Sequence, residues 1–161
     1  MKIFLICMTL VFSVFSSANE VGDNMSLLSF YQGIEGEWYE PMTGNSKDSF
    51  FIQYSLVDNV ITLNGHSEST DDDGVTWAGS LFAEYRIDGG VLFSVGREEV
   101  QIKVIELTAT KIVYQNPPYD IPGYSSTTSL ELMDENTLVQ TNSFSSGNES
   151  GGQSQTLKRA N

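Results

Sequence analysis

The sequence predicts an all-β protein: a single antiparallel, up-and-down β-barrel of about eight to ten strands with a short N-terminal helix. From Gly36 onward, apolar and polar residues alternate with a period of two, as in half-buried strands. Short strand-like runs are separated by Gly, Asn and Asp turns at hairpin spacing. No helical segment after the first is long enough to connect parallel strands. A meander of this many strands favours closure into a barrel, because closure removes both exposed sheet edges.

The first residues have the features of a secretory signal peptide. Lys2 is followed by an apolar run, 3–15, and by small residues that end at Ala18. The run is too short to span a bilayer, which needs about 20 apolar residues. We therefore expect cleavage after Ala18, which removes residues 1–18. The mature domain is then 19–161, and the protein is periplasmic or secreted.

Composition excludes several classes of function. Cys7, the only cysteine, lies in the predicted leader, so the mature domain can form no disulfide and no thiolate metal site. The chain has 8 Lys and Arg residues against 21 Asp and Glu residues, a formal net charge of −13. That charge repels nucleic acids and anionic membrane surfaces, so we expect neither as a partner. No second long apolar run follows the leader, so no membrane insertion is expected.

The elements are expected in a simple order. Residues 25–32 predict one or two helical turns, because apolar residues stand at 27, 28, 30 and 31. Asp58 and Asn59 form a hairpin turn between two of the strand-like runs that follow. Segment 145–152, which is rich in Gly, Ser and Asn, is expected to be a connection. The strand-like runs begin at Gly36 and continue at 50–56, 60–63, 76–86, 91–95, 100–107, 111–115, 124–133, 137–144 and 154–159.

The long run 76–86 suggests an interior that binds a ligand. Alternation places Trp77, Leu81 and Tyr85 on one face. With neighbouring strands included, the candidate lining residues are Trp77, Leu81, Tyr85, Phe93 and Tyr114. If these faces point inward, they surround a cavity for a small, mainly apolar or amphipathic ligand. Arg97, near a strand end, is the candidate anchor for an anionic head group. The alternative is that these large side chains fill the barrel and leave no cavity.

A proline-bearing loop provides a second group of candidates. Prolines at 117, 118 and 122 stiffen the loop and keep it out of the sheet ladder. Asn116 and Asp120 are expected to cap its turns through their side chains. Loops at barrel mouths are also where ligands enter, so Asn116, Tyr119 and Asp120 are candidate binding residues.

Three features resemble the lipocalin-like (calycin-type) β-barrels. Gly36-Glu37-Trp38 is similar to the lipocalin Gly-x-Trp at the first strand, and Lys158-Arg159 stands on the last strand. Segment 113–122 is similar to an Asn-Pro-x-His-Asp-x-Pro segment of small exported bacterial lipocalin-like proteins of uncharacterised function. Here Tyr119 replaces the histidine, so no histidine role carries over. The resemblance implies structural roles for Gly36, Trp38 and Arg159, with the tryptophan closing one barrel end beneath the cation.

The sequence predicts no enzyme, metal site or cofactor. His66, the only histidine, lies on the face opposite Ile61 and Leu63 and cannot build a histidine-rich zinc site. A Ser-His-Asp triad would depend on that one residue. The acidic turn 71–74 fails as an EF-hand calcium loop, because Ser80 stands where a bidentate glutamate is required.

Two functions follow from these observations, with a third ranked below them. The first is an exported barrel that binds a small, mainly apolar ligand in its interior. The alternative is a structural or protein-interaction barrel with a filled core, whose loops engage another exported protein. Catalysis ranks last, because the sequence contains no recognisable acid–base pair.

Overall fold

A computed structural model describes residues 20–41, 48–117 and 121–160. The predicted leader, 1–18, and two of the candidate binding residues, Tyr119 and Asp120, lie outside this part of the chain. Within the described residues, no helix has both the length and the apolar character needed to cross a bilayer.

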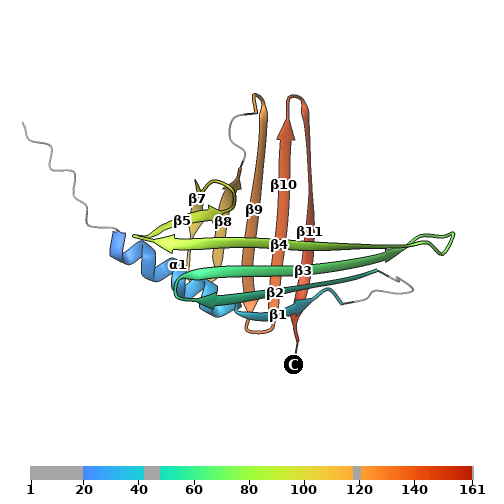
Figure 1. Cartoon of the computed structure of the whole chain (residues 1–161), viewed down its shortest axis with the longest axis horizontal. Helices are drawn as coiled ribbons and strands as arrows, with labels where there is room; N and C mark the ends of the chain where they lie inside the picture. The colour runs from blue at the N-terminus through green and yellow to red at the C-terminus, as the bar shows by residue number, and fades with distance from the viewer. Residues whose placement is uncertain (1–19, 42–47, 118–120, 161) are drawn as a thin grey trace, which may run out of the picture.

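The prediction of an all-β, up-and-down antiparallel barrel with a short N-terminal helix is confirmed (Figure 1). The helix is α1 (Glu20–Ile34). The strands are β1 (Gly36–Tyr39), β2 (Ser49–Val57), β3 (Val60–Thr70), β4 (Thr76–Asp88), β5 (Val91–Val95), β6 (Val100–Gln101), β7 (Lys103–Leu107), β8 (Lys111–Asn116), β9 (Tyr124–Asp134), β10 (Thr137–Ser146) and β11 (Glu149–Arg159).

The barrel is nearly closed. β1 pairs with both β2 and β11, so the first and last strands join, with Trp38 opposite Arg159. The two remaining edges belong to β6 and β7, which are separated by Ile102 alone. β6 pairs with β5, whereas β7 pairs with β8. The expected single run 100–107 is thus divided at Ile102, and the described chain has eleven strands rather than the eight to ten expected.

Several elements extend beyond their apolar patterns. The helix has 15 residues instead of one or two turns. β3 continues to Thr70, far past the apolar run that ends at Leu63. The expected connection 145–152 is almost entirely strand, because β10 and β11 pair without interruption from Thr137 to the turn at Gly147 and Asn148. Backbone hydrogen bonds between neighbouring strands therefore maintain the strand conformation where the residues are small and polar.

The molecule has two unlike ends. In Figure 1, β2–β4 cross β9–β11 steeply, and the far ends of both groups project away from α1 in different directions. We call the end that carries α1 the closed end. The open end comprises the far halves of the long strands, residues 64–82 of β3–β4 and 124–128 and 142–153 of β9–β11.

The hydrophobic core lies at the closed end. Four side chains of α1 pack into it, and the other members come from the adjoining halves of the strands and from Ile102. Its buried members are Leu27, Phe30, Tyr31, Ile34, Trp38, Ile52, Tyr54, Ile61, Leu63, Ile87, Leu92, Ile102, Ile112, Tyr114, Leu130, Leu138 and Leu157. The helix closes this end of the barrel, because its buried side chains pack against those of the strands.

Trp38 and Arg159 fasten the helix to the barrel. The Trp38 ring is 0% exposed, and its Nε1 donates a hydrogen bond to the Ile34 carbonyl at 2.8 Å. The Arg159 guanidinium carbon lies 4.3 Å from the ring centroid, within cation–π range. The guanidinium also donates hydrogen bonds to three backbone carbonyls, those of Gly33, Glu35 and Glu135. One side chain thus ties the helix C-terminus to the β9–β10 turn, and cations favour helix C-termini.

Candidate ligand-binding site at the open end

The inner face of β8–β11 changes character along the strands. Near the closed end, Leu138 pairs with Leu132 and Leu157 to form an apolar row across the sheet. Four residues further along β10, strand register aligns Tyr114, Thr128, Asn142 and Gln153 in a polar row. Because side chains alternate between faces with period two, both rows face the barrel interior.

Hydrogen bonds connect the polar side chains of this inner face. Asn116 Nδ2 donates to the hydroxyl oxygens of Ser126 and Thr128, each at 3.0 Å. The Thr128 hydroxyl lies 2.9 Å from Asn142 Oδ1, to which it can donate. Thr128 is itself buried, so the network fixes these groups rather than leaving them free in solvent. The inner face therefore carries a pre-positioned, uncharged polar surface.

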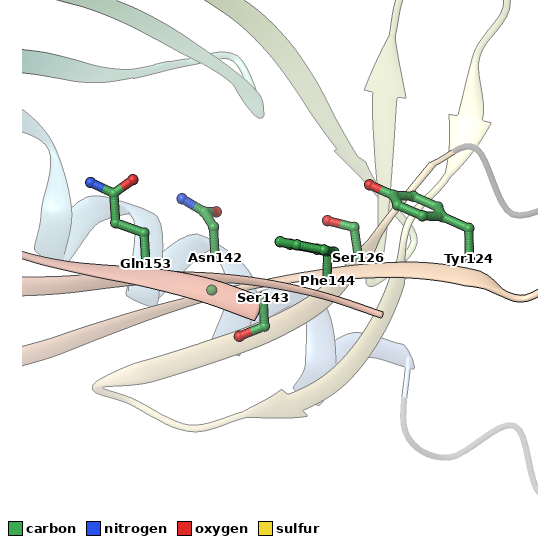
Figure 2. A pocket seen from close by; sticks show the side chains of 7 residues that line it. Tyr124, Ser126, Asn142, Ser143, Phe144 and Gln153 are labelled. Carbon is green, nitrogen blue, oxygen red and sulfur yellow. The ribbon is translucent and has the colours of Figure 1, made fainter. Parts of the chain in front are cut away.

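A cavity of about 510 Å³, open to solvent, lies over this surface. It is lined by Tyr124, Ser126, Asn142, Ser143, Phe144, Gly152 and Gln153. In Figure 2, the amide ends of Asn142 and Gln153 stand on the same side of the sheet as Phe144 and Tyr124, whereas Ser143 points to the other side. The volume falls in the range of small-molecule sites.

Gly151 lets the Phe144 ring lie close to the sheet. The two residues are paired across β10 and β11. A Cβ added at Gly151 would come within 2.9 Å of two ring carbons, closer than real contacts allow. The ring therefore covers the glycine backbone and presents its other face to the cavity, with the Asn142 amide beside it (Figure 2).

The inner face of β2–β4 at the open end is mostly apolar instead, with glycines and one serine between larger apolar side chains. Gly65 pairs with Leu81, and Ser67 pairs with both Phe50 and Gly79. A cavity of about 150 Å³ lies here, lined by Phe50, Gly65, His66, Ser67, Gly79, Ser80 and Leu81. Trp77 follows on the same inner face, and its ring is 67% exposed. The open end thus combines an amide-rich surface on one strand group with an apolar surface on the other.

Four tyrosines of the core and its border lie near one another, where the core meets the polar row that contains Tyr114. Burial raises the pKa of Tyr31, Tyr54, Tyr85 and Tyr114, so their hydroxyls remain neutral at physiological pH. The rings of Tyr85 and Tyr114 meet edge to face with centroids 6.3 Å apart, and their hydroxyls share a hydrogen bond. The Tyr54 hydroxyl is buried without a hydrogen-bond partner among the described residues.

The structure brings together some of the candidates from the sequence. Trp77, Leu81 and Tyr85 share the inner face of β4, as alternation predicts, and Tyr114 and Asn116 lie on the inner face of β8. Trp77, Leu81 and Asn116 belong to the open end or its border. Tyr85 and Tyr114 belong to the core boundary.

Two other candidates lie elsewhere. Phe93 pairs with Arg86 on the outer face, and the Arg86 guanidinium carbon lies 5.1 Å from the Phe93 ring centroid. It cannot line the interior, because the two-residue turn at Gly89 and Gly90 places Ser94, not Phe93, opposite Tyr85. Arg97 is exposed in the turn after β5 and does not line the 510 Å³ cavity.

Five residues that line the larger cavity are not among the candidates from the sequence: Tyr124, Ser126, Asn142, Phe144 and Gln153. Gln153 lies between the connection predicted at 145–152 and the strand predicted at 154–159. The sequence does contain a signal for this hairpin, the dipeptide Gly147-Asn148. In the structure these two residues form the turn, and Gly147 has a positive φ of 59°. Extending the strands on either side of that turn places Phe144 opposite Gly151 and Asn142 opposite Gln153.

The described residues contain no cluster of three or more side chains suited to a metal ion. His66 Nε2 lies 3.2 Å from Glu68 Oε1 at the surface. In the acidic turn, Asp71 Oδ1 accepts a hydrogen bond from the Val75 amide at 2.8 Å, so this carboxylate shapes the turn.

No protein-family model and no curated protein sequence matches the chain.

Proposed function

We propose that this chain is an exported, lipocalin-like barrel that binds a small, mainly apolar or amphipathic ligand at its open end. The observation that carries the proposal is the 510 Å³ cavity on the inner face of β9–β11, with two aromatic side chains beside uncharged amides and hydroxyls. Apolar walls with a few fixed polar groups are typical of small-molecule sites.

The ligand belongs in the open end rather than in the centre of the barrel. The closed end is filled by α1 and by the buried side chains of the core. Close-packed interiors leave no room for a guest without the loss of core contacts. A bound molecule would therefore contact Phe144, Asn142 and Gln153.

The lipocalin-like assignment draws support from the closed end. Gly36-Glu37-Trp38 opens β1, and Arg159 of β11 covers the buried Trp38 ring. A tryptophan closing one barrel end beneath a cation is the arrangement that the resemblance implies. Export draws support from the leader-like pattern at 1–18, and the intact mass of the mature protein would test cleavage after Ala18.

Native mass spectrometry of the protein from its own exported fraction tests the binding proposal. We expect a stoichiometric adduct that organic extraction releases. A Phe144→Ala variant should lose the adduct, whereas Phe82→Ala, which removes an exposed aromatic ring from the outer face of β4, should keep it. An apo mass for the wild type, together with no binding from a panel of apolar and amphipathic compounds, would contradict the proposal.

A protein-interaction barrel is the second candidate. Large apolar side chains are exposed on both faces of β4, Trp77 on the inner face (67% exposed) and Phe82 on the outer face (65%), and exposed apolar side chains can mark partner surfaces. The same native spectra discriminate between the two candidates. A complex with a second exported protein that Trp77→Ala and Phe82→Ala disrupt would favour this one.

A further inference from the structure

We infer that the ligand presents an uncharged, hydrogen-bonding head group, of the hydroxyl or amide class, to the inner face of β9–β11. This inference rests on the proposed function, and it specifies which class of amphipathic molecule the open end selects. It also changes the expectation from the sequence, in which Arg97 anchors an anionic head group.

The cavity lining has no charge to offer an ionic head group. None of its seven residues is Lys, Arg, His, Asp or Glu. Glu149 pairs with Ser146 at the start of β11, three residues before the lining residue Gly152. Glu149 would repel an anion at the rim. A carboxylate or phosphate placed over Asn142 would therefore gain no cation in exchange for the water that it displaces.

The cations of the described chain are engaged or lie away from this cavity. Arg86 pairs with Asp88 and Glu99, and Lys111 pairs with Glu106. Arg159 is held in the closed end, where Lys158 also donates to the Thr137 hydroxyl. Lys103 pairs with Gln115 on the outer face, and Arg97 is exposed in its turn. None of these side chains lines the cavity.

The groups that do face the cavity match a neutral polar partner. Asn142 uses its Oδ1 to accept from Thr128, and its amide N–H groups, which have no partner among the described residues, remain available to a ligand. The Asn142 and Gln153 amides extend beside Phe144 (Figure 2). On the same face of β10, the buried Gln140 Oε1 has no hydrogen-bond partner among the described residues. The site thus offers both donors and acceptors, and unpaired buried groups discriminate against ligands that leave them unsatisfied.

The Phe144 ring adds a flat apolar contact next to these groups. Because the ring lies over Gly151, one of its faces remains for a ligand, and Phe144 is 45% exposed. A head group with hydroxyls at its edge and an apolar face, such as a sugar ring, satisfies the ring and the amides together. An anionic head group leaves the acceptors of the site unpaired, and a cationic head group leaves its amide N–H donors unpaired.

Three amphiphiles with ten-carbon alkyl or acyl chains and different head groups test the inference. Decyl β-glucoside is neutral, decanoate is anionic and decyltrimethylammonium is cationic; each is titrated below its micelle-forming concentration at pH 7 by calorimetry. We expect decyl glucoside to bind at least about tenfold more tightly than either ion. Equal or tighter binding of decanoate or of the cation would overturn the inference and leave the proposed function standing. If none of the three binds, the proposed function fails and the inference fails with it.

Two variants locate the selectivity. Asn142→Leu keeps the side-chain size but removes the amide, and should weaken decyl glucoside binding about tenfold while leaving decanoate binding unchanged. Arg97→Gln should change the affinity of no probe. Circular dichroism verifies that both variants fold. A loss of decanoate binding in Arg97→Gln, with decanoate the tightest probe, would instead assign an anionic ligand to the turn after β5.

Discussion

The closed and open ends are built from the same strands yet have opposite interiors. At the closed end, the inner positions of β9–β11 carry Leu130, Leu138 and Leu157, all fully buried against the helix side of the core. At the open end, the same inner face carries Asn142 and Gln153, with backbone pairing unchanged. Backbone hydrogen bonds therefore extend the sheet well beyond the region that apolar burial stabilises.

Because of this difference, we expect stability to depend on the closed end and ligand binding to depend on the open end. Burial of apolar surface is the dominant favourable term in folding, and here it is concentrated beside α1. The open end contributes few side chains to the core, so a ligand can be contacted there without the loss of core packing. Substitutions at the closed end should change the free energy of unfolding, whereas substitutions at the open end should change affinity.

The largest expected effect compares the only two tryptophans in the sequence. Trp38→Ala should lower the free energy of unfolding by about 3–5 kcal/mol, because it leaves a large cavity beneath Arg159. Trp77→Ala, at the open end, should change it by less than about 0.5 kcal/mol, because the ring is mostly exposed. Urea denaturation measures both. Similar losses in the two variants would show that the ends do not differ in stability.

Alkaline pH should act through the four tyrosines of the core and its border. Burial raises the pKa of Tyr31, Tyr54, Tyr85 and Tyr114 in the folded state. Their neutral forms therefore stabilise the fold below about pH 10, the ordinary tyrosine pKa. As pH rises above that value, the unfolded chain releases these protons first and stability falls, by about 1.4 kcal/mol per tyrosine for each unit of pKa difference.

Tyrosinate absorbance at 295 nm, followed together with circular dichroism, tests this dependence. We expect the four buried phenols to ionise only as the fold is lost, in one cooperative step. Ionisation of all tyrosines near pH 10 with the circular dichroism spectrum unchanged would contradict it.

A smaller effect distinguishes two of these hydroxyls. Tyr54→Phe removes a buried hydroxyl that has no partner among the described residues and should be neutral or stabilising, by up to about 1 kcal/mol. Tyr114→Phe removes the hydrogen bond to Tyr85 and should cost about 1 kcal/mol. Thermal unfolding of both variants and of the wild type measures the difference. A clear loss of stability in Tyr54→Phe would show that its hydroxyl has a partner in solution.

The comparison of the two ends also explains what the sequence could predict. Apolar residues at alternate positions predict the strand halves beside α1 and also the exposed half of β4, where Trp77 and Leu81 keep the period. The polar half of β3, from Asn64 to Thr70, and the segment 145–152 have no apolar period, and only their backbone pairing makes them strands. Both segments contain Gly, Asn and Glu, which are depleted in strands on average, and local context overrides that preference here.

Whether a site residue could be assigned to the inner face from the sequence depended on the strand register. On β4, simple alternation correctly put Trp77, Leu81 and Tyr85 on one face. Across the Gly89–Gly90 turn, the assignment of Phe93 required counting a two-residue loop, which the sequence contains. The register shift between Thr137 and Leu138 has no such signal, so the alignment of Asn142 with Thr128 could not be obtained from the sequence alone.

The smallest effect on stability should accompany a clear effect on binding. In Gly151→Ala, the new methyl group would meet the outer carbons of the Phe144 ring at 2.9 Å, and this exposed ring can rotate away at little cost. We expect a change of less than about 0.5 kcal/mol in the free energy of unfolding. Binding of decyl glucoside should weaken several-fold, because the displaced ring no longer lies flat beside Asn142.

Gly36→Ala is the matched substitution at the closed end. Gly36 has a φ of 124°, and an added Cβ would lie 3.0 Å from an Arg159 guanidinium nitrogen that is held by hydrogen bonds. Neither the backbone at residue 36 nor the Arg159 side chain can move to make room for a methyl group, so the variant should lose about 1–3 kcal/mol in the free energy of unfolding. Its affinity for decyl glucoside should stay at the wild-type value under conditions where it is folded. If Gly151→Ala destabilised the fold as much as Gly36→Ala and left binding intact, Phe144 would be a packing residue, and the open end would belong to the core.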